Sequence, residues 1–231
     1  SINLDCIGVA SKDKGAKIRI VSVNYNMDFS IDVETLESSV DNCTVNLVCG
    51  LLDGFKKRGH KVGGFNAYIS SIVISAAGVS SSASFEMLLC VIINDLFNEN
   101  NLDVVECAKI GQYAENHYWN KSSGLLDQIA CAVGGLINID FYDETKPKIS
   151  KMDIDFTKLG YGIVIVNTGK GHADLSDEYS SIPQEMKSVA NFFGKSVCAE
   201  ISINDIVENI DGLRKSVGDR AILRAIHFCN E

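Results

Sequence analysis

The apolar pattern of this chain changes from strand-like alternation to helix-like spacing, and this order constrains the fold more than any single motif does. Residues 6–9 and 16–22 alternate around the turn-rich run SKDKG and predict a β-hairpin. Further strands are expected at 66–74, 135–141 and 161–167, and helices at 45–58, 80–97, 103–118, 123–133, 184–193 and 218–229. Because strands come first and helices follow in runs, without strict alternation, the pattern predicts an α+β fold rather than a doubly wound parallel sheet.

Composition then limits the partners. The 231 residues suit one domain or one and a half, and the net charge of −9 repels phosphate backbones and anionic lipid. No apolar run approaches the roughly 18–20 residues that span a bilayer. We therefore expect a cytoplasmic protein that binds neither nucleic acid nor a membrane. The eight cysteines are scattered without a CxxC pair, which indicates reduced core residues rather than a zinc site or a disulfide framework.

The most informative motif is Gly78-Val79-Ser80-Ser81-Ser82-Ala83-Ser84, between a predicted strand and a long apolar helix. A helix N-terminus offers unpaired N–H groups and partial positive charge, small residues admit a phosphate, and serine hydroxyls are hard oxygen ligands suited to Mg²⁺. The alternative is that the serines cap the helix. The G-x-x-x-x-G-K-[ST], G-x-G-x-x-G and G-x-S-x-G patterns are absent here.

Two carboxylates form a second candidate feature. Glu115 lies late in the helix expected from Asp103, and Asp127 lies early in the next helix, where the helix dipole keeps a carboxylate ionised. Such a group could accept a hydroxyl proton or orient the hydroxyl for attack on phosphorus. The alternative is that both are solvated surface charges, although Leu125, Leu126 and Ile129 make the surroundings of Asp127 apolar.

The third feature is the polar run 167–179, which follows an apolar strand and ends in Tyr179. Polar residues at the end of a strand often line a site, and a tyrosine hydroxyl could bind a sugar. Tyr179 could equally be a core aromatic, and Lys170 and His172 could pair with acidic neighbours.

Together these segments resemble galactokinases of the GHMP small-molecule kinase superfamily. The resemblance rests on GVSSSASFE (78–86), AENHYWNKSSGLLDQIACAVG (114–134), NTGKGHADLSDEY (167–179) and GDRAILRAIHFCNE (218–231), and it extends through essentially the whole chain. The serine motif indicates only the superfamily, and the other three indicate galactokinases in particular.

The resemblance implies a GHMP kinase fold, with a ribosomal protein S5 domain 2-like N-terminal domain over residues 1–155 and the beginning of a C-terminal α/β domain over 156–231. It implies ATP and Mg²⁺ as cofactors, galactose as substrate and a monomer. Asp127 is then the catalytic carboxylate and contacts the sugar, Tyr179 also contacts galactose, and Ser82 and Glu115 hold the metal. The ATP-binding residues are Ala76, Ala77, Gly78, Val79, Ser80, Ser81 and Ser82.

The chain also departs from the family pattern. Ile74, Ala76 and Ala77 stand near positions where proline and glycine are usual, and Asn120 replaces a common glycine. The family's catalytic Arg, its Glu-His-x-Asp-like sugar run and its glycine-rich third motif are not in this sequence, so we expect an internal kinase fragment with little turnover by itself. Two alternatives stay open: a non-catalytic sensor of sugar and ATP, and a GHMP kinase for another sugar, mevalonate or homoserine.

Overall fold

A computed structural model describes residues 1–37, 43–75, 77–119, 121–143, 145–166 and 176–231. The chain forms two compact units, Ser1–Gly171 and His172–Glu231. The first combines strands with helices and the second is helical in its described part, which agrees with the predicted α+β class. The domain boundary expected near residue 155 stays a prediction.

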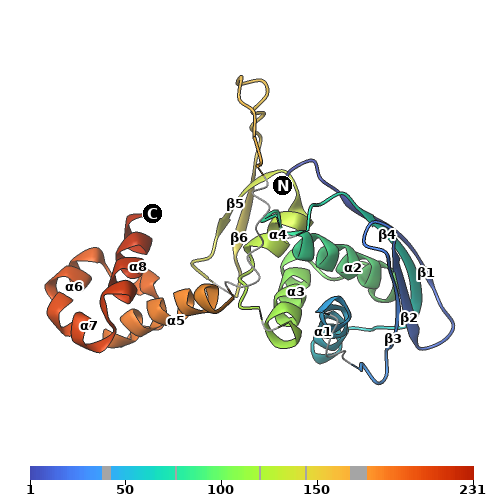
Figure 1. Cartoon of the computed structure of the whole chain (residues 1–231), viewed down its shortest axis with the longest axis horizontal. Helices are drawn as coiled ribbons and strands as arrows, with labels where there is room; N and C mark the ends of the chain where they lie inside the picture. Colours follow the sequence, from blue (N-terminus) through green and yellow to red (C-terminus); the bar gives the residue numbers. More distant parts are fainter. Residues whose placement is uncertain (38–42, 76, 120, 144, 167–175) are drawn as a thin grey trace. The chain divides into compact units, whose positions relative to one another are not determined.

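The first unit contains a sheet of four strands in the order β1-β4-β2-β3 (Figure 1). They are β1 (Cys6–Lys12), β2 (Lys17–Ser22), β3 (Met27–Asp32) and β4 (Phe65–Ser71). The predicted hairpin between β1 and β2 is wrong, because β4 lies between them, antiparallel to β1 and parallel to β2. Gly64 makes this insertion sterically feasible: a Cβ there would lie 2.2 Å from the carbonyl oxygen of Gly15 in the β1–β2 connection.

Four helices lie on the same side of this sheet, two of them against its strands and two packed on those helices (Figure 1). They are α1 (Cys43–Lys57), α2 (Ser81–Asn98), α3 (Val104–Tyr118) and α4 (Leu126–Val133), and all four predicted helices are confirmed with ends shifted by a few residues. The core between sheet and helices includes Ile18, Ile20, Leu51, Phe55, Phe65, Ile69, Leu89 and Ile110. Burial of these side chains, at about 25 cal/mol per Å² of apolar surface, holds α1 and α2 against the sheet and α3 against those two helices.

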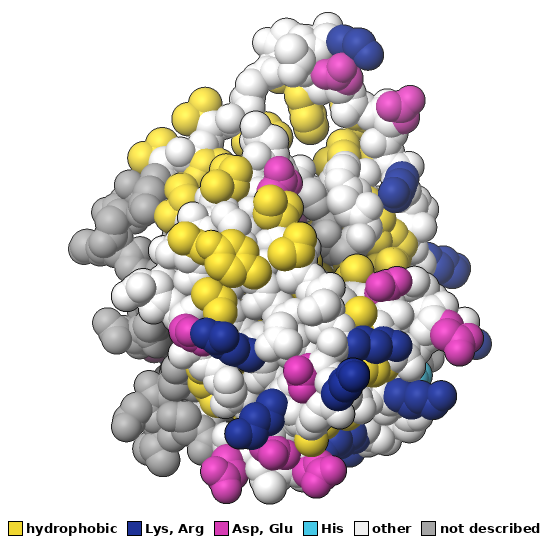
Figure 2. Space-filling model, turned by 90° about the vertical axis from the view of Figure 1, so that its right-hand side faces the viewer, with side chains coloured by type: hydrophobic (Ala, Val, Ile, Leu, Met, Phe, Trp, Pro, Cys, Tyr) yellow, Lys and Arg dark blue, Asp and Glu magenta, His cyan; other side chains and the backbone are white. Residues whose placement is uncertain are grey.

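The opposite face of the sheet is open to solvent. Apolar side chains gather on its upper part and charged side chains lie below them (Figure 2). Ile7, Val9 and Tyr68 of β1 and β4 are 64%, 71% and 51% exposed. This alternation of buried and exposed residues is the pattern of a sheet covered on one side.

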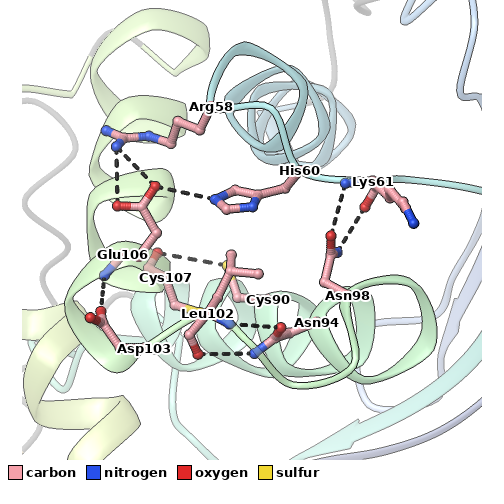
Figure 3. Close-up of polar contacts among 10 residues, drawn as sticks. All are labelled: Arg58, His60, Lys61, Cys90, Asn94, Asn98, Leu102, Asp103, Glu106 and Cys107. Atoms are coloured by element: carbon pink, nitrogen blue, oxygen red, sulfur yellow. Dashed lines mark hydrogen bonds and ion pairs between the residues drawn. The ribbon is translucent and has the colours of Figure 1, made fainter.

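Polar side chains tie α1, α2 and α3 together at the ends remote from the serine motif (Figure 3). Glu106 of α3 accepts from Arg58 at 3.2 and 3.3 Å and contacts His60 Nε2 at 3.3 Å. Asp103 caps α3 by accepting from the Glu106 amide at 2.8 Å, as the sequence predicts. Asn94 of α2 exchanges two hydrogen bonds with the backbone of Leu102. The relative placement of these three helices is therefore fixed by polar contacts as well as by the core.

A separate two-stranded sheet follows, formed by β5 (Leu136–Asp140) and β6 (Lys148–Met152). β5 confirms a predicted strand. The strand predicted at 161–167 is wrong over residues 161–166, which have no regular structure, and Asn167 lies outside the described residues. Val164 is 84% exposed, because no strand of the described ranges hydrogen-bonds to this apolar segment.

The second unit is helical where it is described. It contains α5 (Ser176–Phe192), the 3₁₀ turn η2 (Cys198–Glu200), α6 (Ile203–Glu208), α7 (Ile210–Ser216) and α8 (Asp219–Asn230). Its core includes Val189, Ile206, Leu213 and Ile222. The predicted helix 218–229 is confirmed as α8, whereas the helix predicted from 184 begins earlier and includes Pro183.

Two further findings bear on the sequence predictions. The seven cysteines whose side chains the structure describes are all free thiols, and four of them are buried. Over the described part of the chain, none of the helices is both long and apolar enough to cross a membrane.

Candidate active site

The serine motif lies at the start of α2, as predicted. Gly78 has φ +72°, and Ser80, the N-cap residue, also has a left-handed backbone with φ 58°. The Ser80 side chain makes no capping hydrogen bond. The capping explanation therefore fails for Ser80, and its hydroxyl is not used to complete the helix. Ala77 is not among the described residues with positive φ, and Ala76 lies outside the described residues.

Ser82, in the first turn of α2, meets Glu115 from the last turn of α3. The Ser82 hydroxyl donates to Glu115 Oε1 at 2.9 Å. Lys121, which follows α3, places its ammonium nitrogen 2.5 Å from the same carboxylate oxygen and 3.3 Å from the serine oxygen. The two predicted metal ligands are thus adjacent, and a cationic side chain contacts both of them.

The charge of Glu115 depends on these neighbours. Burial, at 1% exposure, would by itself raise the pKa of this carboxyl. Hydrogen bonds from Lys121, Ser123 and Ser82, together with the positive charge of Lys121, outweigh burial and hold the pKa of Glu115 below its usual value. Glu115 is therefore an ionised carboxylate at neutral pH.

Behind Glu115 lie two more buried polar side chains. Gln128 of α4 donates from Nε2 to Glu115 Oε2 at 3.2 Å and to Glu86 Oε2 of α2 at 3.1 Å. Glu86 and Gln128 are both 0% exposed. Burial, and next the negative charge of Glu115, raise the pKa of Glu86 well above its usual value.

Asp127 directly precedes Gln128 and lies in the first turn of α4, half-buried. The N-cap residue, Leu125, has no side chain that can cap, so Asp127 supplies the negative charge that favours this end of the helix. Because the Gln128 side chain hydrogen-bonds to Glu86 and Glu115, the backbone of the neighbouring Asp127 is held next to these buried side chains. The solvated-surface alternative is thus wrong for Glu115 and does not describe the half-buried Asp127.

The remaining predicted residue lies in the second unit. Tyr179 is on α5 and its side chain is 52% exposed. Residues 167–175 of the same polar run lie outside the described residues, Lys170 and His172 included.

Sequence reasoning missed three members of this cluster: Glu86, Lys121 and Gln128. Glu86 carried a signal, because it is a lone carboxylate inside the apolar run of α2, four residues after Ser82 and hence on the same helix face. Gln128 is next to the predicted catalytic aspartate. Nothing in the local pattern indicates that Lys121 folds back onto Glu115.

The oxygens of Ser82 and Glu115 suit a hard divalent cation only if other ligands complete its coordination. Among the described residues, no group of three or more His, Cys, Asp or Glu side chains is arranged to hold a metal. Ser82 and Glu115 supply two oxygen ligands. Mg²⁺ typically takes one or two protein carboxylates and keeps waters and substrate phosphates for the rest. The pair therefore fits a magnesium ion that arrives with a nucleotide, provided that the Lys121 ammonium moves away.

One segment of the chain matches a known protein family. Residues 46–135, which run from α1 to the start of β5 and include Ser82, Glu115 and Asp127, match the family described as GHMP kinases N terminal domain. This segment of the chain is therefore similar to the N-terminal domain of GHMP kinases.

The chain is also similar to galactokinases. It is 29% identical over 233 residues to the galactokinase of Clostridium tetani, which covers 100% of this chain and 59% of the relative, and 32% identical over 185 residues to that of Lactobacillus helveticus, which covers 78% and 47%. The crystal structure of Lactococcus lactis galactokinase complexed with galactose has the same fold, with a TM-score of 0.76 at 24% identity over 100% of this chain and 60% of that one. The chain spans about half to three fifths of the length of these relatives.

Proposed function

We propose that the protein containing this chain transfers the γ-phosphoryl group of ATP to the 1-hydroxyl of galactose. The observation that carries the proposal is the pairing of Ser82 and Glu115, 2.9 Å apart at the N-terminus of α2, beside the helix that bears Asp127. The similarity to galactokinases supports galactose as the acceptor, and Tyr179 is the residue we assign to the sugar.

The start of α2 is the proposed phosphate site. Its backbone N–H groups and helix dipole attract anionic oxygens, and Gly78 allows the left-handed turn before it. The contacts would come from the backbone and hydroxyls of the run from Ala76 to Ser82. An acidic chain can therefore bind a triphosphate without a basic patch.

Ser82 and Glu115 are the proposed magnesium ligands. When bound, the ion neutralises phosphate charge during transfer. Glu115 suits this role because it is ionised and its carboxylate is held at both oxygens.

Asp127 is the proposed catalytic carboxylate. It accepts or orients the proton of the sugar hydroxyl while that oxygen attacks the phosphorus in line. A half-buried carboxylate in the first turn of a helix has few alternative positions, which favours orientation.

The test is the Asp127→Asn variant of the protein as its gene encodes it, assayed for galactose-dependent ADP formation. We expect turnover to fall by about 10²–10⁴-fold, with the fold intact by circular dichroism. Asp211→Asn is the matched control, because Asp211 also lies in the first turn of a helix but is exposed. Undiminished turnover in Asp127→Asn would exclude this role for Asp127.

A non-catalytic sensor is the second candidate, and the position of Lys121 favours it, since an ammonium group contacts both proposed metal ligands. A sensor would bind ATP and galactose in calorimetry without forming ADP. Binding with turnover toward mevalonate, homoserine or another sugar, but not galactose, would instead indicate a different GHMP kinase.

A further inference from the structure

The buried cluster of Glu86, Glu115 and Gln128 brings three helices to one point. Glu86 belongs to α2, Glu115 to α3 and Gln128 to α4. Their side chains are 0%, 1% and 0% exposed. A single amide nitrogen, Gln128 Nε2, donates to both carboxylates, at 3.1 and 3.2 Å. Since that nitrogen carries two hydrogens, the carboxyl groups of Glu86 and Glu115 can each accept one of them.

The cluster has little room to rearrange. Gly111 of α3 faces it, and a Cβ at this position would lie 2.8 Å from Glu86 Oε2 and 3.1 Å from Gln128 Cγ. The side chains of Glu86 and Gln128 therefore lie against the α3 backbone. With so little free volume around the amide, the position of Gln128 Nε2 determines the position of Glu115 Oε2.

Stability alone does not account for this arrangement. Burying polar groups costs free energy unless every one is paired, and well-packed apolar residues serve the core equally well. Glu86 Oε1 and Gln128 Oε1 are buried and have no hydrogen-bond partner within the described part of the chain. A cluster that leaves two oxygens unpaired is costly as a core element, which indicates that it serves the carboxylate it holds.

The two oxygens of Glu115 have different surroundings. Oε2 points to the amide of Gln128, whereas Oε1 contacts the Ser82 hydroxyl and the Lys121 ammonium, which a bound metal would displace. We propose that Gln128, anchored by Glu86, is a positioning residue that fixes Glu115 Oε2 so that Oε1 faces Ser82 and is available to the metal. This inference rests on the proposed function, because it assigns Glu115 as a metal ligand. Removing a side chain that hydrogen-bonds to a metal ligand typically weakens metal affinity about 10–100-fold.

The test measures Mn²⁺ affinity in the presence of ATP and without sugar, by electron paramagnetic resonance, so that the readout does not depend on turnover. We expect Gln128→Met to weaken Mn²⁺ binding about tenfold or more, because the apolar side chain fills the space but cannot hold Oε2. Gln128→Asn is the second variant, in which the amide remains but is too short to bridge both carboxylates. Glu86→Gln is the conservative variant, since its carbonyl still accepts from Gln128, and its affinity should stay within about twofold of wild type.

Met87→Leu is the matched control. Met87 Cε also lies against Gly111, at 2.9 Å from a Cβ built there, but this change alters only apolar packing. Unchanged affinity in folded Gln128→Met or Gln128→Asn would overturn the inference, and so would an equal loss in Met87→Leu or Glu86→Gln. A wild-type protein that binds ATP but no Mn²⁺ would overturn the proposed metal site and the inference with it. Unchanged affinity in the Gln128 variants would overturn the inference alone, so the two failures can be told apart.

Discussion

Gly50→Ala should disturb the contact that places the candidate metal ligand. Gly50 of α1 faces Ala114 of α3, the residue before Glu115. A Cβ at position 50 would lie 2.8 Å from Ala114 Cα, 2.9 Å from Ala114 Cβ and 3.0 Å from Tyr118 Cβ. None of these three atoms moves by side-chain rotation, so α1 and α3 must separate.

The expected cost follows from two opposing effects. Overpacking a tight interior contact costs about 1–3 kcal/mol, and replacing a helical glycine by alanine returns about 1 kcal/mol. Because all three close contacts involve backbone or Cβ atoms, we place the overpacking cost at the upper end of its range and expect a net loss of about 1–2 kcal/mol. Gly54→Ala is the matched control in the same helix. Its new Cβ would lie 3.2 Å from Ile110 Cγ2 and Tyr113 Cδ1 and 3.6 Å from the Ile110 carbonyl oxygen, so the neighbours need to move much less and we expect a change within about 0.5 kcal/mol.

Urea denaturation followed by the fluorescence of Trp119 measures this loss. Trp119 is the only tryptophan of the chain and packs against the core of the first unit, so its signal reports the unfolding of that unit. With an m-value of about 2 kcal/mol per M, the middle of the usual range, the midpoint should fall by roughly 0.5–1 M in Gly50→Ala. A midpoint equal to that of Gly54→Ala would refute the reasoning, since it would show that the α1–α3 contact relaxes at no cost.

Three further changes have defined outcomes. Lys121→Met should tighten Mn²⁺ binding to Glu115 and Ser82 by about tenfold, because a partly exposed ammonium competes at a strength reduced by solvent; calorimetry showing weaker binding would contradict this. Glu86→Gln should flatten the pH dependence of stability. The raised pKa means that the folded state keeps a proton that the unfolded chain releases above its usual pKa of 4.5, so wild-type stability falls as pH rises from there toward the folded pKa, by up to about 1.4 kcal/mol per unit. If urea unfolding at pH 5, 6 and 7 gives the same change of stability with pH in wild type and Glu86→Gln, this account of Glu86 is excluded. Asp103→Ala should cost about 1 kcal/mol through the lost cap of α3, measured by the same unfolding assay.

The helices of the first unit were predictable because their signals are local. Apolar residues at helical spacing and the Asp103 cap of α3 each depend on neighbours within a few residues. The serine motif was placed correctly at the start of α2 for the same reason. The location of Asp127 in a first helical turn also follows from such local signals.

Strand pairing was not predictable in the same way. The alternation of β1 and β2 is real, but alternation identifies a strand and not its partner. The deciding contact involves Gly64, about 50 residues from β1, whose missing side chain lets the β1–β2 connection pass over the start of β4. The segment 161–166 is a related case: its apolar alternation indicates a strand, yet a strand needs a neighbour to hydrogen-bond, and the described chain provides none.

The site depends both on local helix signals and on contacts between segments far apart in the sequence. Glycines allow the closest of these contacts. Gly50 lets α3 approach α1, and Gly111 lets it approach the buried side chains of α2 and α4, so two close contacts on different sides fix the helix that bears Glu115. The carboxylate is then held at one oxygen by Gln128 and at the other by Ser82. If this account is correct, Gly50→Ala should weaken Mn²⁺ binding even in molecules that remain folded, although residue 50 touches no proposed ligand. Geometry at Glu115 would then be a property of helix packing rather than of the serine motif alone.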